Sequence, residues 1–451
     1  MRALNRNSRS EELRRAAGKI FASALRAVDA RLAIRRVVAL DGSELIRIFD
    51  DSLDATDRKI YAVAIGKAGP AMAAGLAEIL GARISRGVLT GPALQNNGIL
   101  VPSIWQVFAG GHPLPNQQSL AAAEAALELL QRAQDERGLV IFLISGGGSA
   151  MIERPRDGRI TLEDLREANR VLVSSSATIK EINAVRQAFS AIKGGGLSAA
   201  APDADQITLI VSDTNAGDEA SVASGPSLVQ AGDSLSAKEV VRQYDLAYKL
   251  PESITEIIAA DAAKQAPAPK GLRKHYVLLD NMTAVEAAAT KARELGCEVE
   301  IAADLVEQPI AEGVGQLIAR LKLIWQRRAY DRPVCLLSGG EFACSVRGNG
   351  LGGRNLETVL RCALDISTAT ESGWKHVVVL SAGTDGIDGN SPAAGAFADE
   401  TTVSRAHSIG LNPLSFLKES DSFRLLQTLD DAIVTGATGT NVRDLRILLA
   451  C

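Results

Sequence analysis

Short apolar segments alternate with stretches of helical periodicity along most of the chain. Strands are predicted at Ile60–Ile65, at residues 139–144 and at residues 206–211, where apolar side chains dominate. Between them, Ala and Leu recur at helical spacing over residues 117–134, which predicts a helix. Apolar strands joined by helices are typical of a parallel sheet that helices cover on both faces. The pattern therefore predicts an α/β fold.

A stretch in which the alternation of strands and helices is weaker divides the chain into two parts. We expect an N-terminal Rossmann-like, doubly wound domain at residues 1–250, a linker at 251–274, and a smaller C-terminal α/β domain at 275–451. The linker is assigned because KQAPAPKGLRK, at 264–274, is rich in proline and basic residues. Two domains are also expected because the chain has 451 residues, whereas one core usually serves about 250–300 residues at most.

Composition and charge exclude several classes of protein. The formal net charge is −4, so no overall positive field indicates a nucleic-acid partner. Every apolar run is of strand length, well short of the ~20 residues that cross a bilayer. The five cysteines show no C-x-x-C spacing, which favours reduced thiols. We expect a cytoplasmic protein that binds a small molecule and neither membrane nor nucleic acid, with a homodimer as one option for its assembly.

Glycine-rich turns with polar residues follow several predicted strands. Lys67 lies in AIGKAG, at a predicted helix N-terminus, where the helix dipole also favours an anion. A second turn contains Ser145, Gly146, Gly147, Gly148 and Ser149, and its glycines allow backbone N–H groups to approach a phosphate. This turn is not a Walker motif and lacks the G-x-G-x-x-G spacing of a dinucleotide site. We expect an anion site, against the alternative of a tight turn and a surface lysine.

Carboxylates occupy two further loops. Asp213 and Asp218 lie in SDTNAGDEASVASGP, directly after a predicted strand, and Asp385 lies in GTDGIDG. A carboxylate at such a position accepts a proton from a substrate hydroxyl or binds Mg²⁺. Aspartate is also common as a cap in turns. The residues alone leave both readings open.

The predicted C-terminal domain carries its own glycine-rich segments. Arg354 begins a predicted helix after GNGLGG, and a cation at that end of a helix is disfavoured by the dipole. Arginine is suited to binding a carboxylate or a phosphate through two parallel hydrogen bonds. We therefore expect a functional Arg354. In the SGGE segment, Gly339, Gly340 and Glu341 are candidates for contacts with a cofactor.

Taken together, these segments resemble the MOFRL-type, class II glycerate 2-kinase family. The matching stretches are 65–68 (IGKA), 111–115 (GHPLP), 145–150 (SGGGSA), 181–195 (EINAVRQAFSAIKGG), 212–226, 338–341, 350–357, 383–389 and 435–445 (TGATGTNVRDL). The resemblance implies transfer of the γ-phosphoryl group of ATP to the 2-hydroxyl of D-glycerate, with Mg²⁺ as the metal. It also implies an active site in a cleft between the two domains.

The resemblance assigns roles by position. Lys67 is similar to the family's phosphate- or substrate-binding lysine, and Arg354 to its substrate-binding arginine. The turn from Ser145 to Ser149 is similar to the nucleotide-phosphate turn. Asp213 is the candidate base for the glycerate hydroxyl, while Asp218 and Asp385 are candidate Mg²⁺ ligands.

Two other functions remain alternatives. A hydroxypyruvate reductase-type oxidoreductase would need a nicotinamide site, which the SGGGSA turn does not provide. A non-catalytic protein that binds a nucleotide or an organic acid would keep the same fold, because a fold does not fix a function.

Overall fold

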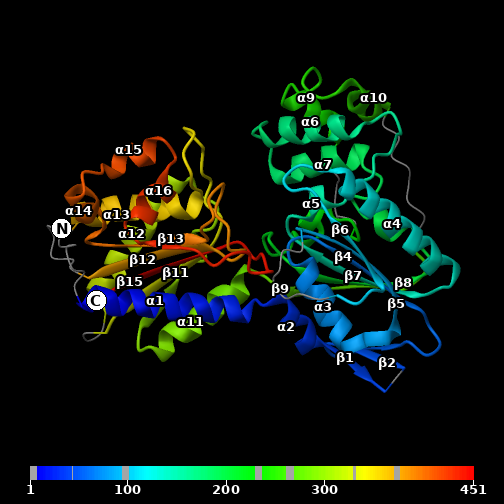
Figure 1. Cartoon of the computed structure of the whole chain (residues 1–451), viewed down its shortest axis with the longest axis horizontal. Helices are drawn as coiled ribbons and strands as arrows, with labels where there is room; N and C mark the ends of the chain where they lie inside the picture. Colours follow the sequence, from blue (N-terminus) through cyan, green and yellow to red (C-terminus); the bar gives the residue numbers. More distant parts are fainter. Residues whose placement is uncertain are drawn as a thin grey trace. The chain divides into compact units, whose positions relative to one another are not determined.

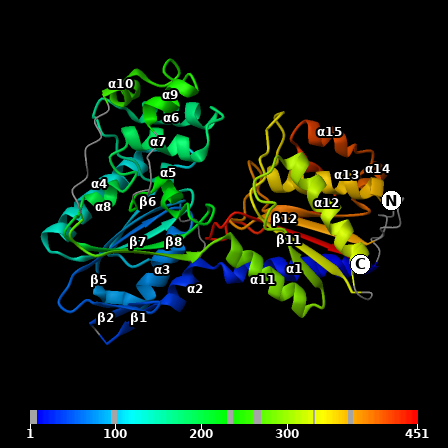
Figure 2. The same ribbon diagram turned by 180° about the vertical axis from the view of Figure 1, so that it is seen from behind.

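The computed structural model describes residues 8–42, 44–93, 101–228, 236–260, 269–328, 332–369 and 376–451 (Figure 1). The chain divides into two compact units. One unit is Ala30–Leu279, and the other joins the residues up to Asp29 with Asp280–Cys451. Figure 2 shows the same elements from behind. Among the described residues, no helix combines the length and the apolar character needed to cross a bilayer.

The Ala30–Leu279 unit is built on a six-stranded sheet with the order β6-β5-β4-β7-β8-β9. All neighbouring strands in this sheet are parallel. The strands are β4 (Ile60–Ile65), β5 (Ile84–Gly91), β6 (Trp105–Ala109), β7 (Leu139–Ser145), β8 (Asp205–Val211) and β9 (Arg273–Leu279). Strands β4 and β7 are buried at every position, as their uninterrupted apolar sequences predict.

Helices cover this sheet. Val63, Ile65 and Phe142 belong to one apolar cluster with the buried side of α4. Helix α3 contacts β4, β5 and β7 and packs against α2. The helices of the unit are α2 (Ala30–Val37), α3 (Gly69–Leu80), α4 (Gln117–Asp135), α5 (Gly148–Met151), α6 (Leu162–Val173), α7 (Ile179–Phe189), α8 (Gly196–Ala199), α9 (Ala237–Gln243) and α10 (Glu252–Ala260), with 3-10 turns η1 (Gly81–Arg83) and η2 (Glu219–Ser224). A three-stranded antiparallel sheet adds β1 (Val38–Asp41), β2 (Leu45–Ile48) and β3 (Asp51–Asp54).

The second unit is built on a mixed sheet with the order β10-β11-β15-β12-β13-β14. Only β10 and β11 run parallel in it, and the other pairs are antiparallel. Its strands are β10 (Glu298–Ile301), β11 (Val334–Gly340), β12 (Val377–Gly383), β13 (Gly395–Asp399), β14 (Ala432–Ile433) and β15 (Asp444–Ala450). Its helices are α1 (Ser8–Ala27), α11 (Asn281–Glu294), α12 (Ile310–Arg327), α13 (Arg354–Ala369), α14 (Thr402–Ser408), α15 (Pro413–Lys418) and α16 (Ser422–Thr428). Two α/β units confirm the predicted fold class.

The observed boundaries differ from the predicted division at 250 and 275. Helix α1 packs on α11, β12 and β15 of the second unit, because Ile20, Phe21 and Ala24 bury one apolar face there. Within the predicted linker, 252–260 is helix α10, and β9 begins at Arg273 and pairs with β8 in the first sheet. Residues 261–268 of that linker lie outside the described residues. The contacts of α1 with distant elements leave no local pattern in the sequence, so the sequence did not predict that α1 belongs to the second unit.

Candidate active-site residues

Lys67 lies against the glycine-rich turn that follows β7. Strands β4 and β7 are parallel neighbours, so the turns after them meet at one edge of the sheet. The backbone N–H of Lys67 donates to the carbonyl oxygen of Gly146 at 2.9 Å. Gly147 has a φ of 76°, and a Cβ there would lie 3.0 Å from Cγ of Lys67. The structure therefore brings the lysine and the turn together.

Ser145 connects the turn after β4 with the turn after β7 through its side chain. Its hydroxyl donates to the carbonyl oxygen of Ile65 at 3.2 Å and accepts from the N–H of Ala68 at 2.9 Å. The side chain is fully buried. Gly66, with a φ of 108°, allows this approach, since a Cβ there would lie 2.3 Å from the Ser145 carbonyl oxygen. The Ser145 hydroxyl thus holds the turn after β4 against the turn after β7, and its role in cofactor binding stays a prediction.

Ser149 begins a chain of hydrogen bonds that sequence reasoning missed. Its hydroxyl lies 2.7 Å from that of Ser224, which in turn donates to Oδ1 of Asn183 at 2.8 Å. Ser224 and Asn183 are both 2% exposed. Ala223 and Ser224 have left-handed φ values of 53° and 63°, a conformation that costs energy in residues other than glycine. In the sequence, Asn183 and Ser224 were indicated only by the resemblance of segments 181–195 and 212–226 to the family.

The loop after β8 places its two aspartates differently. Asp213 follows Ser212, whose N–H donates to the carbonyl oxygen of Leu279 at 2.8 Å. Asp213 is half-buried, at the carboxyl end of the sheet. The carboxylate of Asp218 pairs with Nζ of Lys180 at 2.7 Å. A cation at Asp218 would therefore have to compete with a lysine.

Asp385, the other candidate metal ligand, belongs to the second unit. Its Oδ1 accepts from the N–H of Ile387 at 3.2 Å, as a turn-capping aspartate does. Within the described ranges, no group of three or more His, Cys, Asp and Glu side chains is arranged to hold a metal ion. Magnesium usually needs only one or two carboxylates beside substrate phosphates. The single carboxylate of Asp385 fits that kind of binding.

Arg354 begins α13 and is held by two carboxylates. Its Nε donates to Oδ2 of Asp444 at 2.5 Å, and its Nη2 donates to Oε1 of Glu341 at 2.5 Å and to Oδ1 of Asp444 at 3.3 Å. Burial tends to lower the pKa of Arg354, but the two carboxylates outweigh it and the pKa is raised. Asp444 lies in the family-like segment 435–445, but it was not predicted as a site residue, because its contact with Arg354 spans 90 positions of the chain.

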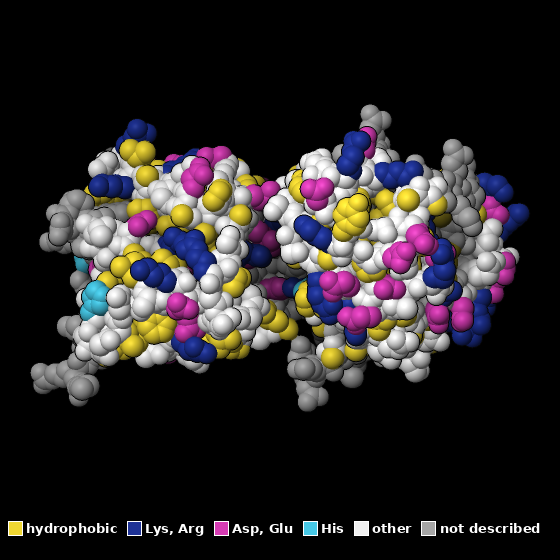
Figure 3. All heavy atoms as spheres, turned by 90° about the horizontal axis from the view of Figure 1, so that it is seen from above, with side chains coloured by type: hydrophobic (Ala, Val, Ile, Leu, Met, Phe, Trp, Pro, Cys, Tyr) yellow, Lys and Arg dark blue, Asp and Glu magenta, His cyan; other side chains and the backbone are white. Residues whose placement is uncertain are grey.

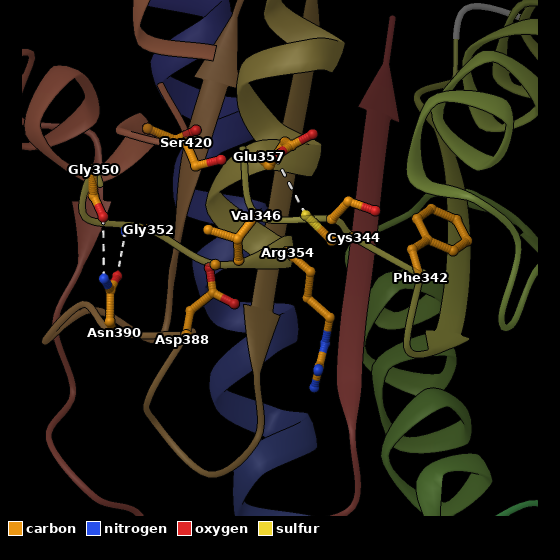
Figure 4. Close-up of a pocket in the computed structure, with 14 residues that line it drawn as sticks. Phe342, Cys344, Val346, Gly350, Gly352, Arg354, Glu357, Asp388, Asn390 and Ser420 are labelled. Atoms are coloured by element: carbon orange, nitrogen blue, oxygen red, sulfur yellow. Dashed lines mark hydrogen bonds between the residues drawn. The ribbon is translucent and has the colours of Figure 1, made fainter. Parts of the chain in front are cut away.

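Asp388 caps the helix that Arg354 begins. Its carboxylate accepts from the N–H groups of Asn355 at 3.1 Å and Leu356 at 2.8 Å. Burial raises the pKa of Asp388 to about 7, and the nearby Asp444 also raises it, whereas the N–H of Leu356 lowers it. Beside this cap lies a cavity of about 390 Å³, lined by Asp388 and the glycine-rich loop before α13 (Figure 4).

The SGGE segment proves to be tightly packed. Oδ1 of Asn281 accepts from the N–H of Gly340 at 2.9 Å, and a Cβ on Gly339 would lie 1.7 Å from the same oxygen. The carbonyl oxygen of Gly339 accepts from the buried Arg446. These two glycines are therefore tightly packed, and Glu341 is the member of the segment that contacts Arg354. Contacts of the segment with a cofactor stay a prediction.

Family models match both units of the chain. A domain of unknown function, DUF4147, matches residues 16–259, and the MOFRL family matches residues 334–444. A D-glycerate 2-kinase of Thermotoga maritima is 33% identical over 394 residues, which is 86% of this chain and 90% of that protein. The human glycerate kinase is 32% identical over 96% of this chain and 92% of its own.

The chain belongs to the glycerate kinase family. A crystal structure of glycerate kinase from Thermotoga maritima matches with a TM-score of 0.79 and 30% identity, over 98% of this chain and all of that one. This confirms the predicted resemblance. One further member of similar sequence, from Agrobacterium vitis, is named a putative hydroxypyruvate reductase and is 35% identical over 86% of this chain and 98% of its own.

Proposed function

We propose that this protein is a glycerate kinase that transfers the γ-phosphoryl group of ATP to the 2-hydroxyl of D-glycerate. The observation that carries the proposal is the position of Lys67 against the glycine-rich turn after β7. A lysine beside backbone N–H groups at the carboxyl end of a parallel sheet is suited to phosphate. Relatives named glycerate 2-kinase and glycerate kinase cover nearly the whole chain, which supports D-glycerate as the acceptor.

Each candidate residue has a separate role in the proposed phosphoryl transfer. Lys67 neutralises charge on the transferring group, which is the main task of the protein in this reaction. Asp213 orients the acceptor hydroxyl and takes up its proton. Arg354 binds the substrate carboxylate. When bound, Mg²⁺ neutralises the phosphate oxygens of ATP, with Asp218 or Asp385 as the carboxylates that would hold it.

We further propose that Lys67 and Arg354, which belong to different units, act on the same reactants. The proposal places the enzyme in the cytoplasm, a location that its five free thiols support. On the face shown in Figure 3, acidic and basic side chains are interspersed, with no large field of a single sign.

The oxidoreductase alternative would require a dinucleotide-binding turn between a strand and a helix. The G-x-G-x-x-G spacing of such turns occurs once in the chain, at Gly348, Gly350 and Gly353. In a dinucleotide site this turn directly joins a strand to a helix. Here β11 ends at Gly340, and residues 341–347 form no strand before the turn. The spacing therefore lies in a loop without the required context, and the kinase is the better interpretation.

Coupled assays test the proposal directly. With ATP and Mg²⁺, D-glycerate should give ADP, and NMR of the product should show phosphate on the 2-hydroxyl. In parallel, NADH with hydroxypyruvate should show no oxidation. NADH consumption without ADP release would establish the oxidoreductase, and calorimetric binding of ATP and D-glycerate without turnover would establish the non-catalytic binding protein.

A further inference from the structure

We propose that Arg186 and Asn183, which lie one turn apart on α7, form a site for an oxyanion group of the reactants. The group is a phosphate of ATP or the carboxylate of D-glycerate, and this choice of reactants rests on the proposed function. The site belongs to the Ala30–Leu279 unit, and it would act together with Lys67 and the glycine-rich turn after β7.

The guanidinium of Arg186 has no carboxylate partner within the described part of the chain. Its Nε donates to Oδ1 of Asn169 on α6 at 3.0 Å, whereas Nη1 and Nη2 donate to no described residue. The side chain is partly buried, and burial lowers the pKa of Arg186. A partly buried cation without a partner costs free energy, which a bound anion would offset. Arg186 is therefore suited to a ligand of negative charge.

Glu153 does not neutralise Arg186. Among the described carboxylates, it is the one whose charge raises the pKa of Arg186 against the effect of burial. Its two oxygens are already engaged, because one pairs with Lys193 and the other accepts from the hydroxyl of Ser190 at 2.6 Å. Burial lowers the pKa of Lys193, Glu153 raises it, and the charge of Arg186 lowers it further. Two cations thus share one carboxylate, which leaves a place for another anion.

Asn183 supplies a second donor on the same face of α7. Its side chain is 2% exposed, and its Oδ1 accepts from the hydroxyl of Ser224 at 2.8 Å. Its Nδ2 has no acceptor among the residues that the structure describes. Residues three positions apart on a helix are neighbours, so this amide lies beside the side chain of Arg186. Amide and guanidinium N–H groups are the donors that carboxylates and phosphates accept from.

The two residues are connected to the segment that follows β7. Asn183 is joined through Ser224 to Ser149 of the glycine-rich turn. Glu153, whose charge acts on Arg186, lies two residues beyond α5, the helix that begins in that turn. Both connections place this part of α7 at the carboxyl end of the parallel sheet, where ligands of such sheets bind.

A purely structural role explains Arg186 less well. It lies in the last turn of α7, where the helix dipole favours a cation. The dipole would act equally on a fully exposed cation that keeps its water. It does not explain why this guanidinium lies beside the charge of Lys193 with no carboxylate of its own.

Calorimetric titration with ATP and, separately, with D-glycerate tests the site in Arg186→Gln. Glutamine keeps a hydrogen-bonding amide but removes the charge and the planar set of donors. One of the two dissociation constants should rise by about 10- to 100-fold, as expected when a hydrogen bond to a charged group is lost. A rise for ATP assigns a phosphate, and a rise for D-glycerate assigns the carboxylate. Unchanged binding of both reactants overturns the proposal.

Arg170→Gln is the matched control for the loss of one positive charge. Arg170 makes exposed pairs with Glu163 at 3.1 Å and Glu167 at 2.7 Å on α6. Its removal should leave both dissociation constants unchanged. Equal weakening in the two variants would assign the effect to net charge and overturn the proposal.

The free energy of unfolding separates binding from a structural role. In Arg186→Gln it should change little, because no carboxylate loses its partner and the repulsion of Lys193 is removed. Urea unfolding measures this difference. A loss as large as that of Lys193→Met would show that Arg186 serves the fold, and it would overturn the proposal.

Inorganic phosphate and acetate provide a test that does not depend on the reaction. At equal ionic strength with chloride, one of these anions should raise the Tm of the unmodified protein and of Arg170→Gln more than that of Arg186→Gln. An equal rise in all three proteins, or no rise in any, overturns the proposal. Failure of the unmodified protein to release ADP with D-glycerate would instead reject the proposed function and leave this test intact.

Discussion

Lys193 and Glu153 form an ion pair in which each side chain is 2% exposed. The other carboxylate oxygen of Glu153 accepts from the hydroxyl of Ser190 at 2.6 Å and from the N–H of Arg154 at 3.0 Å. Glu153 lies just after α5, and Lys193 precedes Gly194, whose N–H bonds to the carbonyl oxygen of Ser224 at 3.1 Å. The pair thus ties the glycine-rich turn to the loop that carries Ser224.

Lys193→Met should destabilise the protein by about 3–5 kcal/mol, because it leaves a buried carboxylate without its partner. Burial already lowers the pKa of Lys193. The double variant Lys193→Met/Glu153→Gln should recover much of the loss, since no charge remains unpaired. Urea unfolding of the unmodified protein and of the two variants measures both effects, and equal instability of the single and double variants would contradict this account.

Lys67→Ala and Arg354→Ala should each abolish kinase activity without unfolding the protein. Both side chains are partly exposed, but Arg354→Ala also takes a partner from the buried carboxylate of Asp444, so this variant should fold with a lower free energy of unfolding. ADP release and circular dichroism check the two halves of this prediction. Lys59→Ala, an exposed lysine just before β4, is the control and should retain activity. Near-normal turnover in either site variant would reject that residue as part of the active site.

Asp213→Asn should lower kcat more than it raises KM, if Asp213 orients the acceptor hydroxyl in the transition state. The asparagine keeps the size of the side chain but removes its ability to take up a proton. Steady-state kinetics at varied D-glycerate concentrations give both constants. An effect confined to KM would reassign Asp213 to substrate binding.

The pH dependence of stability should change in Asp388→Asn. The pKa of Asp388 is raised from 3.8 to about 7 in the folded protein, so the folded state binds its proton more tightly than the unfolded state. Its contribution is therefore fully present below about pH 4 and is lost as the pH rises to 7, by about 1.4 kcal/mol per pH unit. The stability of the unmodified protein relative to the variant should fall across this window and level off above it. Urea unfolding between pH 4 and 8 measures this difference, and a flat difference would contradict the prediction.

Arg14 should anchor the N-terminal helix to the second unit. Its guanidinium donates to Asp399 at 2.6 Å and to Asp431 at 2.9 Å, and neither carboxylate is exposed. Arg14→Met should cost about 3–5 kcal/mol at neutral pH, because two buried carboxylates lose a partner.

The sign of the pH dependence gives a second check on Arg14. Burial tends to raise the pKa of Asp399, but Arg14 and Thr401 outweigh it and the pKa is lowered. This contribution is present above pH 3.8 and is lost as the pH falls below it. The difference between the unmodified protein and Arg14→Met should therefore shrink in acid, whereas a constant difference in urea unfolding would assign the loss to packing.

The features of the site that were predicted are short local motifs, whereas those that were not predicted are contacts between residues far apart in the chain. Lys67 and the turn from Ser145 to Ser149 were predicted because each directly follows an apolar strand, and parallel strands bring such turns to one edge. Asp444 lies in the family-like segment 435–445, but its contact with Arg354 was not predicted, since no local pattern connects positions 90 residues apart. The same applies to the hydrogen bonds between Ser149, Ser224 and Asn183.

The sequence by itself determined the α/β class, the family and the glycine-rich turns, because periodicity and turn chemistry act over a few neighbouring residues. The tertiary structure alone decided that α1 completes the second unit, that Ser145 joins two turns and that Gly339 packs on Asn281. These outcomes depend on which distant segments share a buried surface. Such contacts arise only when the whole chain has found one way to bury its apolar faces while pairing its buried charges.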